Sequence, residues 1–243
     1  MFKHTLRKAR KLIRALTDLT YMQALRMGVA PGIEHEAVLK TLSCDAVVDI
    51  GANKGQFALV ARRVFPDASL VAFEPLVRPA AVFARLFRRD DKVEFHRIGI
   101  GPVAENRVMY LSAAEDSSSI LPIGEEQIRI FPGTQEAGRE TVQMLRLDEV
   151  WGCEAEAKNG LLKIDVQGFE LDVLKGCEGV LSRFSNVYCE CSFLPLYEGQ
   201  ALADEVIAWL RVRGFRLKGI YNMSYDSKGV AVQGDFLFER AAL

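Results

Sequence analysis

Acidic residues stand at the ends of three separate apolar runs, an arrangement that can bring carboxylates to one ligand site. Asp49, Glu74 and Asp165 each close or follow a short run of apolar residues. Such runs are typical of buried strands in a parallel sheet. Ligands of open parallel sheets bind beyond the carboxyl ends of the strands. The three carboxylates are therefore predicted to face one cleft.

The first acid belongs to the segment from Val47 to Phe57, in which a strand ends at an acid and a helix is entered through two glycines. Gly51 can adopt backbone dihedrals closed to other residues and lets a ligand approach the backbone. A dinucleotide fingerprint needs glycine in place of Asn53, so that a pyrophosphate can lie at the helix N-terminus. Asp49 would repel a pyrophosphate, whereas it would attract the ammonium and sulfonium groups of S-adenosylmethionine. The segment therefore favours S-adenosylmethionine, with the predicted contacts Asp49, Gly51, Asn53, Gly55 and Phe57.

Glu74 and Asp165 extend this interpretation along the ligand. Glu74 lies ~20 residues beyond the first glycine, where a carboxylate can accept hydrogen bonds from ribose hydroxyls. The alternative for Glu74 is a solvated acid at a strand end. Asp165 falls where the transferred methyl group is expected, so it could orient an acceptor hydroxyl or take its proton. The alternative for Asp165 is to cap the helix that follows it.

Three further residues are candidates for the site. Glu190 ends the predicted strand after that of Asp165, so the two carboxylates could be neighbours and could hold a divalent cation. Because only two strong ligands are visible, no metal site is predicted. His96, near the end of the third predicted strand, could act as a base or contact the adenine. His35 precedes the first strand and could close over the cofactor.

The composition is that of a globular protein with a core. Of 243 residues, 49% are hydrophobic and 26% charged, which argues against disorder. The formal net charge of −1 provides no overall field that would attract nucleic acid. Five cysteines without paired C-x-x-C spacing are interpreted as reduced thiols of a cytoplasmic protein.

The first residues are basic, with apolar side chains between the charges at helical spacing from Lys3 to Arg14. This pattern predicts an amphipathic helix, which either packs on the domain or touches an anionic membrane or an acidic partner. No apolar run long enough for a secretory signal or a membrane span follows it.

Apolar runs and helical patterns alternate from residue 46 onward, which predicts a doubly wound, mostly parallel α/β sheet of seven strands. Residues 44–243 would form this domain, and residues 1–43 an N-terminal helical extension. The last two strands flank a turn at residues 226–229, and one of them is predicted to be antiparallel. The predicted strands are 46–50, 70–73, 93–98, 161–164, 187–191, 215–221 and 232–238, and the predicted helices are 54–64, 78–87, 169–175 and 203–213.

One segment departs from this alternation. About 60 residues separate the third and fourth strands, which is far longer than an ordinary connection. Residues 107–111 and 141–145 are predicted as extra strands. Between them, the Ser-, Gly- and Pro-containing stretch 116–133 is interpreted as a binding loop or lid on the acceptor side. The alternative is a surface loop without a role in binding.

These motifs together resemble the FkbM family of S-adenosylmethionine-dependent methyltransferases, over most of the chain from His35 to Arg240. The resemblance implies a Rossmann-like class I fold and O-methylation, in many members of sugar hydroxyls on glycans, lipo-oligosaccharides or glycosylated natural products. It implies that Asp165 faces the methyl group and that the cofactor contacts include Ser118. This chain has Gln167 where many members have Glu. The blocks that carry the resemblance are residues 49–55, 73–75, 116–119, 147–148, 163–170, 196–200 and 233–238.

Other classes of protein lack their markers in this chain. We find no Asn- or Asp-Pro-Pro-aromatic segment of the kind used by amino-nitrogen and nucleic-acid methyltransferases, and the first turn lacks the G-x-G-x-x-G of a dehydrogenase. The remaining alternative is an accessory module of a glycan or membrane assembly, which would bind the cofactor without turning over any hydroxylated acceptor.

Overall fold

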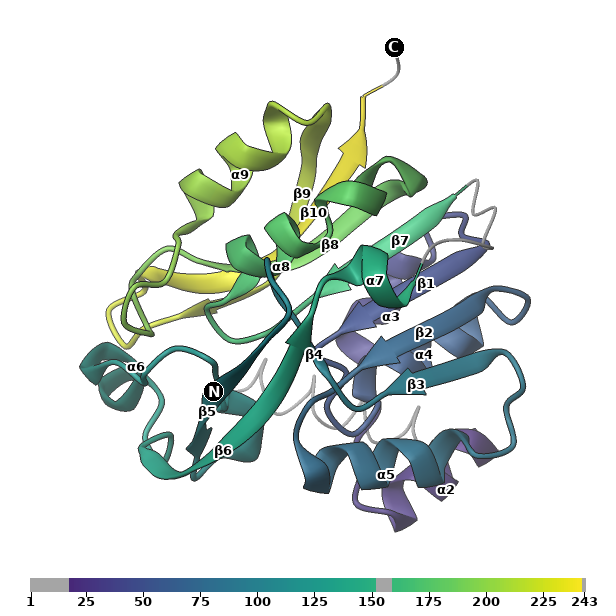
Figure 1. Cartoon of the computed structure of the whole chain (residues 1–243), viewed down its shortest axis with the longest axis horizontal. Helices are drawn as coiled ribbons and strands as arrows, with labels where there is room; N and C mark the ends of the chain where they lie inside the picture. Colours follow the sequence, from purple (N-terminus) through teal and green to yellow (C-terminus); the bar gives the residue numbers. More distant parts are fainter. Residues whose placement is uncertain (1–17, 152–158, 242–243) are drawn as a thin grey trace.

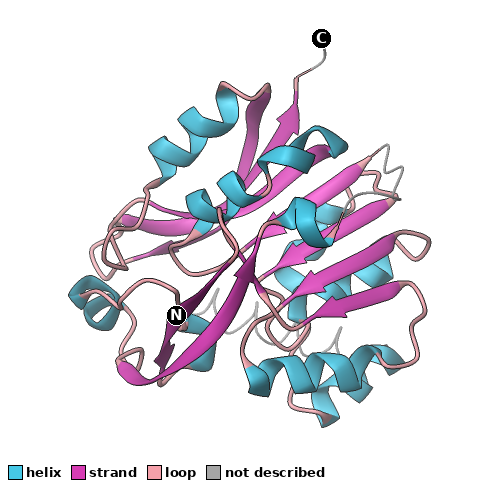
Figure 2. Ribbon diagram, viewed as in Figure 1, coloured by secondary structure: helices cyan, strands magenta, loops and turns pink. Residues whose placement is uncertain are grey.

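Seven strands form one sheet in the described part of the chain, residues 18–151 and 159–241 of this computed structural model. Their order is β3-β2-β1-β7-β8-β10-β9 (Figures 1 and 2). The first five strands of this order run parallel, and β10 lies antiparallel between β8 and β9, which confirms the predicted sheet. The strands are β1 (Ala46–Ile50), β2 (Ser69–Phe73), β3 (Val93–His96), β7 (Gly160–Ile164), β8 (Phe184–Ser192), β9 (Phe215–Tyr225) and β10 (Ala231–Arg240).

Apart from the ionisable residues Asp49 on β1 and Lys163 on β7, the central strands β1 and β7 are apolar, because helices or a second sheet cover both of their faces. On β1, Val47 packs into one hydrophobic core and Val48 into the other. The core around Val47 contains α2 (Leu19–Arg26), η1 (Ile33–His35), α3 (Glu36–Leu39), α4 (Gln56–Val64) and α5 (Val77–Phe87). The core around Val48 contains α8 (Glu170–Gly176), η3 (Glu178–Arg183) and α9 (Ala203–Arg211).

Strand register brings the three predicted acid-bearing loops to one edge of the sheet. Ile50, the last residue of β1, pairs with Phe73 of β2 and with Ile164 of β7. The next residues are joined across the loops, because Gly51 N–H donates to the Phe73 carbonyl and Asp165 N–H donates to the Ile50 carbonyl. The loops that follow β1, β2 and β7 therefore begin side by side at the carboxyl edge of the sheet. Glu74 and Asp165 are the first residues of the second and third of these loops.

The long insertion folds into a small second sheet of order β4-β6-β5, beside the carboxyl edge of the main sheet (Figure 1). Both extra strands are confirmed, and each is longer than predicted. The predicted third strand, 93–98, was too long. The observed strand β3 ends at His96 because the chain leaves the main sheet there, and residues 99–100 pair with β6 instead. The insertion comprises β4 (Gly99–Ile100), β5 (Glu105–Ser112), η2 (Glu115–Ser117), α6 (Glu125–Ile130), β6 (Glu136–Leu145) and α7 (Leu147–Val150).

The described part of the N-terminal extension packs on the sheet. Tyr21 and Ala24 of α2 are buried in the same core as α4. The predicted basic helix between Lys3 and Arg14 lies outside the described residues. Within the described ranges, no helix is both long and apolar enough to cross a membrane, and Cys44, Cys177, Cys189 and Cys191 are free thiols.

Candidate active site

A cavity of about 800 Å³ opens at the carboxyl edge of the sheet, between the main sheet, η1 and the insertion. It is lined by seven of the ten predicted site residues: Gly51, Asn53, Phe57, Glu74, Ser118, Asp165 and Glu190. Asp49, Gly55 and His96 are not part of its wall. The wall carries the acids Glu34, Glu74, Glu115, Asp116, Asp165 and Glu190 against the bases His35 and Lys163. Such an excess of carboxylates suits a cationic ligand better than a pyrophosphate.

Gly51 is required by a contact between two loops. Its φ is +77°, and a Cβ at this position would lie 1.9 Å from the carbonyl oxygen of Asp165. The sequence predicted this glycine as a point of close approach to a ligand. The structure adds a stronger constraint, since no other residue can occupy the left-handed conformation and leave the Asp165 backbone in place. Gly55, with φ +97°, is required for a similar reason, because a Cβ at this position would lie 2.7 Å from the Phe87 ring.

Glu74 is fixed by the turn that follows β1. Its Oε2 accepts a hydrogen bond from Asn53 N–H at 3.0 Å, and its Oε1 accepts one from Leu76 N–H at 2.9 Å. Burial raises the pKa of Glu74 to about 7, although the two backbone donors oppose this rise. Each carboxylate oxygen keeps a free lone pair for a hydroxyl in the cavity. Glu74 is thus no solvated strand-end acid, being only 5% exposed.

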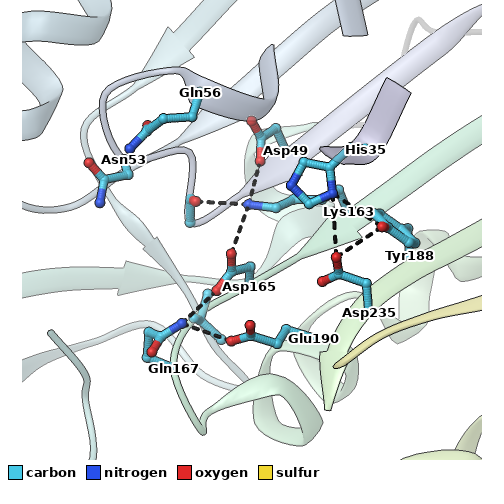
Figure 3. Close-up of polar contacts among 12 residues, drawn as sticks. His35, Asp49, Asn53, Gln56, Lys163, Asp165, Gln167, Tyr188, Glu190 and Asp235 are labelled. Carbon is cyan, nitrogen blue, oxygen red and sulfur yellow. Dashed lines mark hydrogen bonds and ion pairs between the residues drawn. The ribbon is translucent and has the colours of Figure 1, made fainter. Parts of the chain in front are cut away.

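Lys163 is the central cation of the site, although no role in the site was predicted for it from the sequence. Its Nζ lies 3.0 Å from Asp49 Oδ1 and 3.9 Å from Asp165 Oδ2, and it donates to the Gly51 carbonyl at 2.9 Å (Figure 3). Burial lowers the pKa of Lys163, but the charges of Asp49 and Asp165 together outweigh this effect. The pKa of Lys163 is therefore raised. A lysine within an otherwise apolar strand was the signal for such a pair.

The role predicted for Asp49 needs a correction. Asp49 is fully buried and does not line the cavity, and its carboxylate pairs with Lys163, which does (Figure 3). The cation that its charge attracts is therefore the protein's own ammonium group. Burial raises the pKa of Asp49, and Lys163 counteracts that rise. Asp49 acts on the cavity through the position of Lys163.

Asp165 and Glu190 are neighbours, as predicted, but an amide joins them. Gln167 Nε2 donates to Asp165 Oδ1 and to Glu190 Oε2, each at 2.8 Å (Figure 3). Glu190 Oε1 accepts a further hydrogen bond from Gln233 Nε2 at 2.8 Å. Burial and the nearby Asp165 charge raise the pKa of Glu190 well above its usual range. Within the described residues, no group of three or more His, Cys, Asp and Glu side chains is arranged to hold a metal ion.

Asp165 is free of the capping role that was its alternative. The loop before α8 is closed by Glu170, whose Oε1 accepts hydrogen bonds from Gly168 N–H at 2.9 Å and Val166 N–H at 3.2 Å. Asp165 makes no such bond to the helix start. Its side chain is 38% exposed, so its carboxylate reaches the cavity.

The two histidines have different surroundings. His96 stacks on Phe73, with ring centroids 5.1 Å apart, and its Nε2 lies 2.7 Å from Glu94 Oε1. His96 does not line the cavity, so the structure gives no contact with the site that supports its predicted catalytic role. His35 does line the cavity. Its Nδ1 lies 3.1 Å from the Tyr188 hydroxyl and 3.4 Å from Asp235 Oδ2, which orients the ring.

The insertion contacts the site directly. Ser118 lines the cavity, and its hydroxyl accepts from Ser112 N–H at 3.1 Å. Ser119 Oγ donates to the Gln167 carbonyl at 2.6 Å, and Lys54 Nζ pairs with Glu115 Oε2 at 2.5 Å. These contacts tie the loop that was predicted as a lid to the turns after β1 and β7.

A sequence profile of the methyltransferase FkbM domain matches residues 49–217. The 2-O-methyltransferase NoeI of Sinorhizobium fredii is 31% identical over 170 residues, which cover 63% of this chain and 66% of NoeI. The 31-O-demethyl-FK506 methyltransferase FkbM of Streptomyces tacrolimicus is 28% identical over 193 residues, which cover 70% of this chain and 72% of that protein. Methyltransferase 1 of Beauveria bassiana is 29% identical over 147 residues. The aligned region is 54% of this chain and only 58% of that relative.

A similar fold occurs in solved structures. A protein of Klebsiella pneumoniae assigned to the O-methyltransferases superposes with a TM-score of 0.51 at 15% sequence identity, and the match covers 96% of each chain. At this identity the likeness concerns the fold. It supports the Rossmann-like class I architecture that the strand order indicates.

Proposed function

The chain belongs to the FkbM family of S-adenosylmethionine-dependent methyltransferases, and from this premise we propose that it methylates a hydroxyl oxygen of a carbohydrate-containing acceptor. The observation that carries the proposal is the position of Asp165. Its carboxylate reaches the cavity, with Oδ1 held by Gln167 and Oδ2 facing Lys163. Relatives named for O-methylation support oxygen as the accepting atom.

The residues of the cavity fit S-adenosylmethionine. The acid-rich wall suits its positive charge, and the buried Glu74 carboxylate has lone pairs for the ribose hydroxyls. Glu74, Asn53 and the backbone at Gly51 would hold the cofactor, which supplies an electrophilic methyl group when bound. Asp165 Oδ2, which lies 3.9 Å from the Lys163 ammonium, would then orient the acceptor hydroxyl and take its proton as the hydroxyl oxygen receives the methyl group.

Gln127 of α6 supports an uncharged, hydroxyl-bearing acceptor. It is 3% exposed and lines the cavity, and its Oε1 has no hydrogen-bond partner among the described residues. A buried amide oxygen without a partner costs stability unless a ligand satisfies it. A sugar hydroxyl is a donor of suitable chemistry.

Replacing Gln127 by Leu should therefore weaken binding of the acceptor and leave the cofactor site intact. We expect kcat/KM for the acceptor to fall by about tenfold, as for the loss of one buried hydrogen bond, with S-adenosylhomocysteine affinity unchanged. Steady-state kinetics and calorimetry measure the two effects. Gln135→Leu, at an exposed position of the same insertion, is the matched control. Equal kinetics in both variants would remove Gln127 from acceptor binding.

Glu74 predicts a pH dependence of cofactor binding. Because burial raises its pKa to about 7 in the free protein, and ribose hydroxyls donate best to the ionised form, binding should release a proton near neutrality. Affinity for S-adenosylhomocysteine should increase from about pH 6 to about pH 8 and then level off. For the free protein the sign is opposite: stability is lost as pH rises through about 7, since the buried carboxyl must ionise.

Calorimetry at several pH values tests this prediction. Glu74→Gln should weaken binding at high pH by about 1–3 kcal/mol and flatten the pH profile. Glu170, whose pKa burial also raises to about 7, closes the loop before α8 and is not itself part of the cavity wall. A pH profile that persists in Glu74→Gln would assign the proton to another group.

A panel of acceptors tests the proposed activity. The protein is incubated with S-adenosylmethionine and with octyl glycosides of common hexoses and deoxyhexoses, beside aliphatic amines and catechols, and released S-adenosylhomocysteine is measured. Turnover on glycosides supports the proposal. Turnover confined to amines or catechols would contradict it. Cofactor binding without turnover on any hydroxylated compound would favour the accessory module instead.

A further inference from the structure

We infer that Gln167 is a positioning residue that holds Asp165 and Glu190 together through its amide group, at the place where two facing carboxylates would otherwise call for a divalent cation. Its Nε2 lies 2.8 Å from one oxygen of each carboxylate. A planar amide nitrogen carries two hydrogens that point in different directions. Each carboxylate therefore receives one hydrogen, and their mutual repulsion is reduced without a full positive charge.

The amide can take only one orientation. Tyr197 Oη lies 2.9 Å from Gln167 Oε1 and 3.0 Å from the Ser117 carbonyl, so the single hydrogen of this hydroxyl has two acceptors within reach. If the amide were reversed, its oxygen would face one oxygen of each carboxyl group, and a proton on Glu190 could satisfy at most one of these two contacts, whereas the nitrogen donates to both. The two carboxylates thus fix the nitrogen, and the Tyr197 hydroxyl is placed to donate to the oxygen.

The backbone also specifies this placement. Gln167 has φ +57°, in the left-handed region that a residue with a side chain rarely adopts. Its carbonyl accepts from Ser119 Oγ at 2.6 Å, and at Gly168 a Cβ would lie 2.9 Å from the Tyr197 ring. A strained conformation persists where the surrounding contacts determine it, and such residues concentrate at functional sites.

The hydrogen bonds of the Gln167 amide to Asp165 and Glu190, here called the clamp, give the two acids different roles. Glu190 is held on both oxygens, by Gln167 and by Gln233. Asp165 is held on Oδ1 alone, so Oδ2 stays available toward Lys163 and the cavity. Glu190 is thus an anchor for the amide, and Asp165 is the group that meets the acceptor. This assignment rests on the proposed function, whereas the presence of the clamp does not.

Gln167→Glu tests the clamp because it replaces the amide with a third carboxylate. The variant should bind MnCl2 at least about tenfold more tightly than the wild type, because the carboxylates at positions 165, 167 and 190 can then coordinate one cation together. Gln167→Leu, which has neither amide nor charge, should bind no more MnCl2 than the wild type. Calorimetry with MnCl2 needs neither cofactor nor acceptor, so its result is independent of the proposed activity.

Turnover gives the second readout. Wild-type turnover should be unchanged by EDTA, whereas Gln167→Glu should lose about tenfold in EDTA and recover with MnCl2. Gln167→Leu should be impaired and should not recover, which separates the clamp from a merely structural role. Wild-type protein that loses turnover in EDTA would overturn the inference, and this arm needs no variant to fold. Equal MnCl2 affinity in Gln167→Glu and Gln167→Leu would overturn it as well.

Discussion

Asp165→Asn should lower turnover by about 10²–10⁴-fold, the contribution typical of a general base, while S-adenosylhomocysteine affinity changes little. Asparagine keeps the shape of the side chain but removes the basic oxygen that faces the cavity beside Lys163. The two alternatives make different predictions. A helix cap would cost less than about threefold, since Asn caps as well as Asp. A metal pair with Glu190 would make the wild type sensitive to chelation.

The measurement is single-turnover kinetics with saturating cofactor, beside calorimetric titration of the same samples. Asp172→Asn is the matched control, since it is the same substitution at a half-buried position of α8, where Asp172 pairs with Lys175 and does not line the cavity. The control should retain wild-type turnover. If Asp165→Asn does so too, this position has no part in the chemistry, and Glu190 becomes the next candidate.

Lys163→Met should destabilise the protein by about 3–5 kcal/mol, because it leaves buried charge without its partner. Asp49 is fully buried, and the Lys163 ammonium 3.0 Å away is the cation that offsets its charge. The upward pKa shift of Lys163 means that the ammonium stays charged at neutral pH. The Gly51 carbonyl also loses its donor, so the turn after β1 loses order and cofactor affinity falls with stability.

Urea unfolding of the free protein measures this effect. Lys175→Met removes a surface cation from an i,i+3 pair and should cost less than about 1 kcal/mol. The double variant Asp49→Asn with Lys163→Met should recover part of the loss, because the uncompensated charge is then gone. A Lys163→Met variant within about 1 kcal/mol of the wild type would show that Asp49 needs no cation.

The sheet could be predicted because its physical requirement is visible in the sequence. Strands covered on both faces must be apolar at most positions, so β1, β2 and β7 stand out as largely apolar runs that are followed directly by a glycine or an acid. The insertion was harder to predict. Most side chains of β5 and β6 are exposed or half-buried, and the ends of these strands depend on their pairing with each other rather than on composition.

Pairwise contacts in the site could not be predicted in the same way. Lys163 faces Asp49 because the two residues are register partners on β7 and β1, and register follows from the assembled sheet. A lone lysine in an apolar run indicates only that some buried acid must accompany it. Gln167 and Gln127 carry even less signal, since an amide is equally common at the surface. Their roles follow from the loop conformation and from the insertion that closes over it.

The most direct test of the proposed function is the mass of the product formed from glycans and glycolipids of the source cell. The extract is incubated with a donor that carries a deuterated methyl group, and the products are fragmented to locate the label. We expect a gain of one labelled methyl on a hydroxyl of a sugar residue, absent with Asp165→Asn. Label found only on nitrogen or on a molecule without sugar, or no label from a protein that binds S-adenosylhomocysteine, would contradict the proposal.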